Sequence, residues 1–96
     1  MPWYRVMLNG EHFFLDCEGE PKRMGFYSAK FVKASREVEA VELAKAQIHE
    51  DRRLGAQLEE EDGLAKLNVE EVHEVDDTSV PEAPRGMTFY AEETDG

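Results

Sequence analysis

WYRVMLNGEHFFLD, residues 3–16, places two apolar runs on either side of Asn9 and Gly10. A two-residue type I′ turn needs positive φ at both central positions, and the Asn-Gly pair adopts that conformation most readily. The pattern therefore predicts a β-hairpin that turns at Asn9 and Gly10, so that Val6 faces Phe13 across the two strands.

One side of this expected hairpin is predicted to face the core, and it carries Tyr4, Val6, Leu8, Glu11, Phe13 and Leu15. The other side carries Trp3, Arg5, Met7, His12 and Phe14, which make it too apolar for a surface that faces only water. Aromatic residues, Met and Arg are enriched at protein interfaces, so these five residues form the predicted interface. In this register Arg5 lies opposite Phe14, which predicts a cation–π pair.

Further along the chain, a strand and a helix follow the hairpin. Residues 24–33 (MGFYSAKFVK) have strand-like composition. Ser35 is expected to cap a long helix that ends near Arg53, with Gly55 just beyond it. The predicted class is α+β, a two-layer sandwich with a mainly antiparallel sheet in the order β-β-β-α-β, with or without a further short strand, and one long helix on one face.

The chain is predicted to hold one domain and a C-terminal extension. Residues 1–79 form the single α+β domain, whose last strand, residues 67–75 (LNVEEVHEV), is acidic and suits a sheet edge, with a short helix as the alternative. Residues 80–96 comprise a Pro-containing linker, a short hydrophobic segment or strand at 87–91 (MTFYA) and an acidic tail. Whether this extension covers the predicted interface is left open by the sequence.

Charge is distributed unevenly, and it limits the partners. Residues 1–53 carry nine Lys or Arg and nine Asp or Glu, whereas residues 54–96 carry two and thirteen. A net charge of −11 favours a basic protein partner and disfavours nucleic acid or an anionic membrane. The single cysteine, together with the lack of a signal peptide and of an 18-residue apolar run, predicts a cytoplasmic protein.

We find no catalytic motif, metal signature or phosphate loop, and we expect no cofactor and no metal. His12, Asp16 and Cys17 are close in sequence, but strand alternation places Cys17 on the opposite side from the other two. A Cys-His pair for nucleophilic catalysis could form only through the fold, because the remaining histidines, His49 and His73, are distant in sequence.

One basic cluster is present in the first half of the chain, made up of Lys22, Arg23, Lys30, Lys33 and Arg36. If Lys30 converges with the turn at Lys22 and Arg23, these side chains could hold a phosphate or an acidic peptide. The alternative is that they neutralise the acidic loops of the molecule itself, which the overall charge favours.

The run Gly25-Phe26-Tyr27, followed by residues 31–35 (FVKAS) and a helix with Glu37 and Ala40, resembles small bacterial single-domain α+β proteins of uncharacterised function. The resemblance covers residues 3–53 and implies no activity. The expected order of three strands and a helix is also similar to that of HicB-type antitoxins, acidic partners of basic toxins. The chain lacks the Pro-Asp-Leu-Pro-Gly-Cys type of motif of those antitoxins, so this second similarity concerns the fold only.

The leading hypothesis is a non-enzymatic protein-binding or regulatory module that uses the outer face of the hairpin, either for a basic partner or for a homodimer. A second hypothesis is a small ligand-binding protein or enzyme with a pocket near the acidic loop, using His73 or His12 with a carboxylate. A third is an antitoxin-like or nucleic-acid-mimicking acidic protein.

Overall fold

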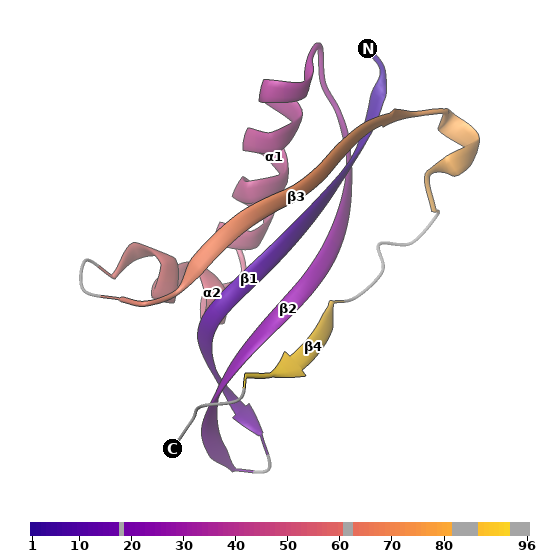
Figure 1. The fold of residues 1–96 in the computed structure, drawn as a ribbon. Helices are drawn as coiled ribbons and strands as arrows, with labels where there is room; N and C mark the ends of the chain where they lie inside the picture. Colours follow the sequence, from indigo (N-terminus) through magenta and orange to yellow (C-terminus); the bar gives the residue numbers. More distant parts are fainter. Residues whose placement is uncertain (18, 61–62, 82–86, 93–96) are drawn as a thin grey trace.

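A computed structural model describes residues 1–17, 19–60, 63–81 and 87–92 of the chain. Its elements, in chain order, are β1 (Trp3–Cys17), β2 (Glu20–Lys33), α1 (Glu37–His49), α2 (Arg52–Glu59), β3 (Lys66–Val75), the 3₁₀-helix η1 (Asp77–Ser79) and β4 (Thr88–Ala91). All neighbouring strands of the sheet are antiparallel, in the order β3-β1-β2-β4, and the helices lie on one side of it (Figure 1). The expected α+β class is confirmed, whereas the expected strand order and the single long helix are wrong.

The predicted turn at Asn9 and Gly10 does not form. Both residues lie inside β1, a single strand of 15 residues, and the hairpin is made by β1 and β2 with its turn after Cys17. Gly19, in that turn, has φ of 87°, a left-handed conformation that glycine adopts without strain. Trp3 therefore pairs with Lys33 at the open end of the hairpin.

A β-bulge explains why the sequence resembled two short strands. Glu11 and His12 together oppose the single residue Gly25, between the pairs Gly10–Phe26 and Phe13–Met24. His12 has φ of 62°, so the backbone is left-handed at this bulge. Because of the extra residue, the side chains of β1 that face the helices have even numbers before the bulge and odd numbers after it. The buried residues on this side are Tyr4, Val6, Leu8, Phe13 and Leu15. These five were predicted as core residues, but within the wrong topology.

Two aromatic rings lie directly over glycines of this hairpin. A Cβ at Gly10 would fall inside the ring of Phe26, 2.6 Å from Cδ1, and a Cβ at Gly25 would fall inside the ring of Tyr90. In both cases the ring belongs to the residue paired with the glycine on the neighbouring strand. The ring covers backbone that would otherwise be exposed, so each glycine is required by packing.

The helical region is broken near Asp51 into α1 and α2. The Asp51 carboxylate accepts hydrogen bonds from the backbone N–H groups of Arg53 and Leu54, at 2.9 and 3.2 Å, and so caps α2. Gly55 lies inside α2 instead of ending a helix, and a Cβ there would be 2.9 Å from the carbonyl carbon of His49. The two helices therefore approach each other closely where α1 ends.

Helix α1 presents a buried stripe of small residues and one isoleucine to the sheet, consisting of Ala40, Ala44 and Ile48. These side chains belong to the same core cluster as Val6, Leu8 and Phe26, and α2 adds Leu54. Leu43, on the same helix, is 42% exposed. Alanines permit the close approach of α1 to the sheet, and Leu43 is left at the margin.

Strand β3 occupies one edge of the sheet, as predicted. A second irregularity, between the pairs Met7–Glu71 and Leu8–Val69, leaves Glu70 without an opposite residue on β1. The bulge explains the uneven spacing of the β3 residues that pack on the core, which are Leu67, Val69 and Val72. This spacing made a short helix the alternative interpretation.

The C-terminal segment crosses the sheet and joins its other edge. After η1, Val80 and Pro81 lie against the sheet face opposite the helices, and β4 then pairs with residues Met24–Tyr27 of β2. The predicted short last strand at residues 87–91 is thus present, as Thr88–Ala91. Most of the predicted linker and tail, residues 82–86 and 93–96, lies outside the described residues. No helix in the described part has the length and apolar character needed to cross a bilayer.

Candidate functional site

The structure separates the five residues of the predicted interface into two groups. Trp3, Arg5 and Met7 alternate along β1 in the proximal half of the hairpin, which comprises residues 3–10 and 26–33. His12 and Phe14 lie at and beyond the bulge, toward the turn. At a rise of roughly 3.3 Å per residue, Trp3 and Phe14 are on the order of 30 Å apart. The predicted interface of five adjacent side chains is therefore wrong as a single cluster.

In the proximal half, the three interface residues lie on the outer face of the sheet, opposite the helices. Trp3 pairs with Lys33, Arg5 with Phe31, and Met7 with Ala29. Trp3, Arg5 and Met7 are half-buried, and the Arg5 guanidinium lies 3.8 Å from a Glu71 carboxylate oxygen. The outer face therefore stays partly open to solvent.

Phe14 makes different contacts from those expected. The Gln57 side chain of α2 accepts a hydrogen bond from the Phe14 N–H at 2.7 Å and donates one to its carbonyl at 2.8 Å. The Phe14 ring is 51% exposed and lies 5.5 Å from the Arg23 guanidinium carbon. The predicted cation–π pair with Arg5 is wrong, because the strand opposite Phe14 is β2 and not the first part of β1.

His12 is held by a carboxylate from the C-terminal segment. Glu92 accepts a hydrogen bond from the backbone N–H of His12 at 2.9 Å, and its other oxygen lies 2.9 Å from the His12 ring nitrogen Nδ1. The Glu92 backbone N–H in turn donates to the Arg23 carbonyl at 3.3 Å. His12 therefore ties the bulge of β1 to the end of β4, which is a structural role.

Replacement of Glu92 by Gln is expected to loosen this contact. The change removes one charge-assisted hydrogen bond, worth about 1 kcal/mol, and the His12 amide should then exchange its hydrogen roughly five times faster. Exchange measured by NMR checks this, with Glu70→Gln on exposed backbone as the control. Unchanged exchange at His12 in Glu92→Gln would show that the carboxylate does not protect the bulge.

In the part of the chain that the structure describes, the edge of β2 beyond β4 is unpaired. Strand β4 pairs with β2 only as far as Tyr27, and among the described residues no strand pairs with the outer side of residues 28–33 (Figure 1). An unpaired edge presents backbone N–H and C=O groups to solvent. This edge is therefore a candidate docking site.

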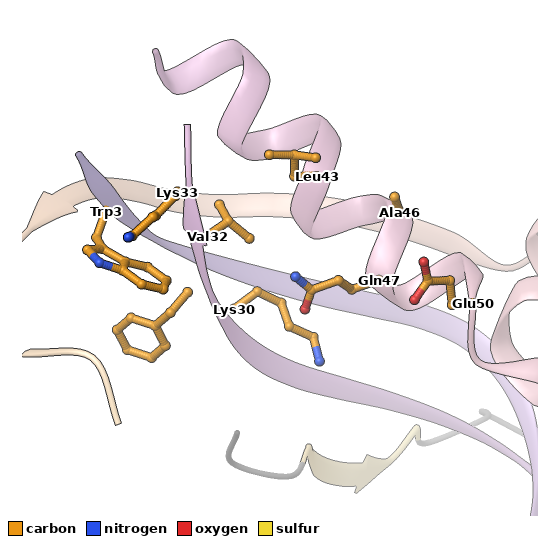
Figure 2. A pocket seen from close by; sticks show the side chains of 9 residues that line it. Trp3, Lys30, Val32, Lys33, Leu43, Ala46, Gln47 and Glu50 are labelled. Carbon is orange, nitrogen blue, oxygen red and sulfur yellow. The ribbon is translucent and has the colours of Figure 1, made fainter. Parts of the chain in front are cut away.

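A groove follows this edge, with a volume of about 810 Å³. Its lining comes from the hairpin and from α1: Trp3, Lys30, Phe31, Val32, Lys33, Leu43, Ala46, Gln47 and Glu50. Figure 2 shows Trp3 and Lys33 on one side of the β2 ribbon, and Leu43, Gln47 and Glu50 on the other. The groove thus runs along the place that another strand beside β2 would occupy. We call it the β2 edge groove.

A smaller hollow of about 320 Å³ adjoins the groove on the outer face. Arg5, Ala29 and Phe31 form its floor, and residues 78–81 form one side. Phe31 contributes to both hollows, so the β2 edge groove and the outer face near Arg5 make one continuous surface. The C-terminal segment therefore covers part of the predicted interface, whereas the surface formed by these two hollows stays open.

The basic cluster does not converge, as a single phosphate or acidic-peptide site would require. Lys22 and Arg23 lie near the turn of the hairpin, whereas Lys30 and Lys33 line the β2 edge groove, about 25 Å away along β2. The Lys33 ammonium lies 5.2 Å from the centre of the Trp3 ring. Two lysines therefore remain beside the free edge, together with one carboxylate, that of Glu50.

Ser28 lies on β2 just beyond the last residue paired with β4. Its hydroxyl is buried and has no hydrogen-bond partner among the described residues, and the residue is 2% exposed. Burying a hydroxyl without a hydrogen-bond partner costs about 1 to 3 kcal/mol of stability. This cost is larger than the energy that one oxygen atom gains from its packing contacts. The unpaired hydroxyl therefore lowers the stability of the fold at the edge of the groove.

Replacement of Ser28 by Ala is consequently expected to stabilise the protein by about 1 kcal/mol, measured by urea unfolding. Ser35→Ala is the matched control. The Ser35 hydroxyl is exposed and lies 3.1 Å from a Glu39 carboxylate oxygen, so its loss should destabilise the start of α1 by about 0.5 kcal/mol. A loss of stability in Ser28→Ala would show that its hydroxyl is hydrogen-bonded in solution.

Side chains suited to metal binding do not converge in the described part of the chain. No three His, Cys, Asp or Glu side chains in that part come close enough to hold a metal ion. His73 is exposed, with a Glu71 carboxylate oxygen 3.7 Å away. Burial, with the carboxylates of Glu74 and Glu37 nearby, raises the pKa of the Tyr4 phenol, which therefore stays protonated at neutral pH.

Sequence reasoning assigned only three residues of the β2 edge groove to candidate sites: Trp3 to the predicted interface, and Lys30 and Lys33 to the basic cluster. Phe31 and Lys30 were placed on a strand, but their neighbours depend on the pairing of β1 with β2. A cue was present in residues 29–33 (AKFVK), where apolar residues are interrupted by lysines, a composition that suits a strand edge. The same cue did not predict that residues of α1 would line the groove.

Comparison of the chain with protein-family models, with curated proteins and with solved structures gave no match. The functional argument therefore rests on the geometry and chemistry of the β2 edge groove and of the outer face beside it.

Proposed function

We propose that the chain is a non-enzymatic protein-binding module, and that it binds through the proximal half of its hairpin. The surface combines the outer-face residues Trp3, Arg5 and Met7 with the β2 edge groove beside Phe31. Aromatic residues, Met and Arg are the types enriched in protein interfaces. His12 and Phe14 are left out of the surface, because they lie toward the other end of β1.

The observation that carries the proposal is the contrast between the two free edges of the sheet. The β3 edge carries several charged or ionisable side chains, namely Lys66, Glu70, Glu71, His73 and Glu74. Charges of this kind are the usual protection of an edge against unwanted pairing. The β2 edge also carries two lysines, Lys30 and Lys33, but it presents the apolar residues Phe31 and Val32 between them, and it opens into a groove. Such a groove gives another segment a place to dock beside the edge.

The acidic part of the chain contributes to the choice of partner. Glu70, Glu71 and Glu74 lie on β3, at the opposite edge of the sheet from the groove. A net charge of −11 attracts a basic partner over distances of about 8 to 10 Å in physiological salt, whereas the groove selects the segment that docks. We therefore propose that the acidic flank increases the association rate with a basic protein.

Selection from a displayed library of random twelve-residue peptides tests the proposed function. The immobilised wild-type protein should retain peptides that a Trp3→Ser, Phe31→Ser variant does not retain. These two aromatic side chains both line the groove, and aromatic residues are the usual binding hot spots, so the variant should bind the selected peptides at least tenfold more weakly. Circular dichroism and thermal unfolding of the variant establish that it remains folded.

Phe14→Ser provides the matched control, because Phe14 is also an exposed aromatic residue of β1 but lies toward the turn. This variant should bind the selected peptides as the wild type does. The proposal is contradicted if no peptide distinguishes the wild type from the Trp3→Ser, Phe31→Ser variant, or if Phe14→Ser loses binding to the same extent.

A further inference from the structure

The direction of the backbone groups along β2 can be derived from two hydrogen bonds. The Arg23 carbonyl accepts a hydrogen bond from the backbone N–H of Glu92. The backbone N–H and C=O groups of odd-numbered β2 residues therefore face β4. At the other end of β2, the Ala34 N–H donates to the Pro2 carbonyl at 3.1 Å. The backbone groups of even-numbered residues near Ala34 therefore face β1. Antiparallel pairs alternate in this way without interruption where the register is regular, as it is from Phe26 to Lys33. The N–H and C=O groups of Ala29, Phe31 and Lys33 therefore point away from β1, toward the open edge of β2.

These six backbone groups form a template for an added strand. Among the described residues no strand pairs with them, and their spacing is that of an ordinary antiparallel or parallel ladder. β-Strand addition uses main-chain hydrogen bonds for affinity and the pockets on either side for specificity. The groove supplies such pockets, with Trp3 on the outer side and Leu43 of α1 on the helix side.

The side chains beside the edge specify the chemistry of the added strand. Lys30 and Val32 point to the helix side, and Phe31 and Lys33 to the outer side, because side chains alternate along a strand. A residue opposite Lys30 or Lys33 is best acidic, and a residue opposite Phe31 or Val32 is best apolar. The order is therefore acidic, apolar, apolar, acidic, which is the same when read in either direction.

We infer that the β2 edge groove binds an extended peptide segment with this acidic–apolar–apolar–acidic pattern, as a fifth strand beside β2. The inference rests on the proposed function and names the partner of the same site. A second copy of the chain fits less well, because β2–β2 pairing would bring together two Lys30 and two Lys33 side chains with only two Glu50 carboxylates. The occupant is thus a segment of another protein whose carboxylates complement the two lysines, while that protein is basic as a whole.

The test uses a fluorescein-labelled peptide, Thr-Glu-Ile-Val-Glu-Thr, titrated with the full chain and followed by fluorescence anisotropy. The expected result is saturable binding that is at least tenfold weaker for Thr-Lys-Ile-Val-Lys-Thr. A Lys30→Glu, Lys33→Glu variant should reverse this preference. Methylation of the backbone nitrogen that faces β2 should weaken binding at least tenfold, whereas methylation of the next nitrogen, which faces away, should have little effect.

The protein offers a matched pair of variants for the backbone contact. Ala29→Pro removes an N–H that points to the open edge of β2 and should weaken peptide binding at least tenfold while β1 and β2 stay paired. Ala56→Ser, on the exposed side of α2 and outside the lining of the groove, changes a side chain only and should bind within twofold of the wild type. Circular dichroism checks that both variants are folded.

Several results would overturn the inference. Binding that does not respond to backbone methylation would show that no strand is added, and equal binding of the two peptides would show that the lysines do not select. A dimer by light scattering that Ala29→Pro dissociates would assign the edge to a second copy. If the glutamate peptide fails to bind while the displayed library yields other peptides, the inference fails and the proposed function stands; if both fail, neither stands.

Discussion

Replacement of Gly10 by Ala is expected to destabilise the protein by about 3 kcal/mol, measured by urea unfolding. The new methyl group would overlap the ring of Phe26, which is fully buried and packs against Phe13 at a centroid distance of 5.2 Å. The ring cannot move away without disturbing this packing, because protein cores contain few voids. The loss is a large part of the stability of a small domain.

A double-mutant cycle separates this explanation from a turn at Gly10. Phe26→Leu removes the ring edge, so Gly10→Ala should cost at least about 1 kcal/mol less in that background than in the wild type. If Asn9 and Gly10 formed a type I′ turn, the cost of Gly10→Ala would come from the positive φ of Gly10 itself. The cost would then be the same with Phe or Leu at position 26, and equal costs would contradict the continuous strand.

The buried positions of the hairpin could be predicted from the sequence, but its topology could not. A change from even to odd buried positions between Leu8 and Phe13 is produced equally well by a turn and by a bulge. The local preference of Asn-Gly favours the turn, whereas the structure is decided by contacts with Phe26 and Tyr90, which are distant in sequence. Local propensity was overridden by tertiary packing.

The same error divided the predicted interface. Once the register is that of β1 with β2, Arg5 faces Phe31 and Phe14 faces Arg23, so residues expected side by side lie toward opposite ends of the hairpin. The break between α1 and α2 was more accessible to prediction. Asp51 before Arg-Arg-Leu is itself an N-cap signal, and it was hidden by the interpretation of Arg53 as the end of one long helix.

Replacement of Asn9 by Asp should have an even larger effect, about 3 to 4 kcal/mol of destabilisation at pH 7. Asn9 is 3% exposed, and its Nδ2 donates to the Phe26 carbonyl at 3.1 Å and to the Tyr90 hydroxyl at 2.9 Å. A carboxylate at this position would be a buried charge facing carbonyl oxygens, with the donors of the amide lost. In a type I′ turn, by contrast, Asp-Gly is as acceptable as Asn-Gly, and the substitution would be nearly neutral.

The pH dependence of the variant gives the cause of this loss. Burial raises the pKa of the introduced carboxyl in the folded state above its unfolded value of about 3.9, so the folded protein favours the protonated form. Relative to the wild type, the variant should therefore lose about 1.4 kcal/mol per pH unit as the pH rises above about 4, until the folded-state pKa is reached. Urea unfolding of both proteins at pH 4 and pH 7 measures the difference.

Asn68→Asp is the control for this prediction, because Asn68 is the β3 residue paired with Asn9 and is only half-buried. Its substitution should cost less than about 1 kcal/mol and should depend weakly on pH, since the introduced carboxylate keeps access to water. Equal effects of the two substitutions would mean that position 9 is as hydrated as position 68. That result would contradict the hydrogen bond of Asn9 with the Tyr90 hydroxyl, and with it the burial of Asn9 beneath the ring of β4.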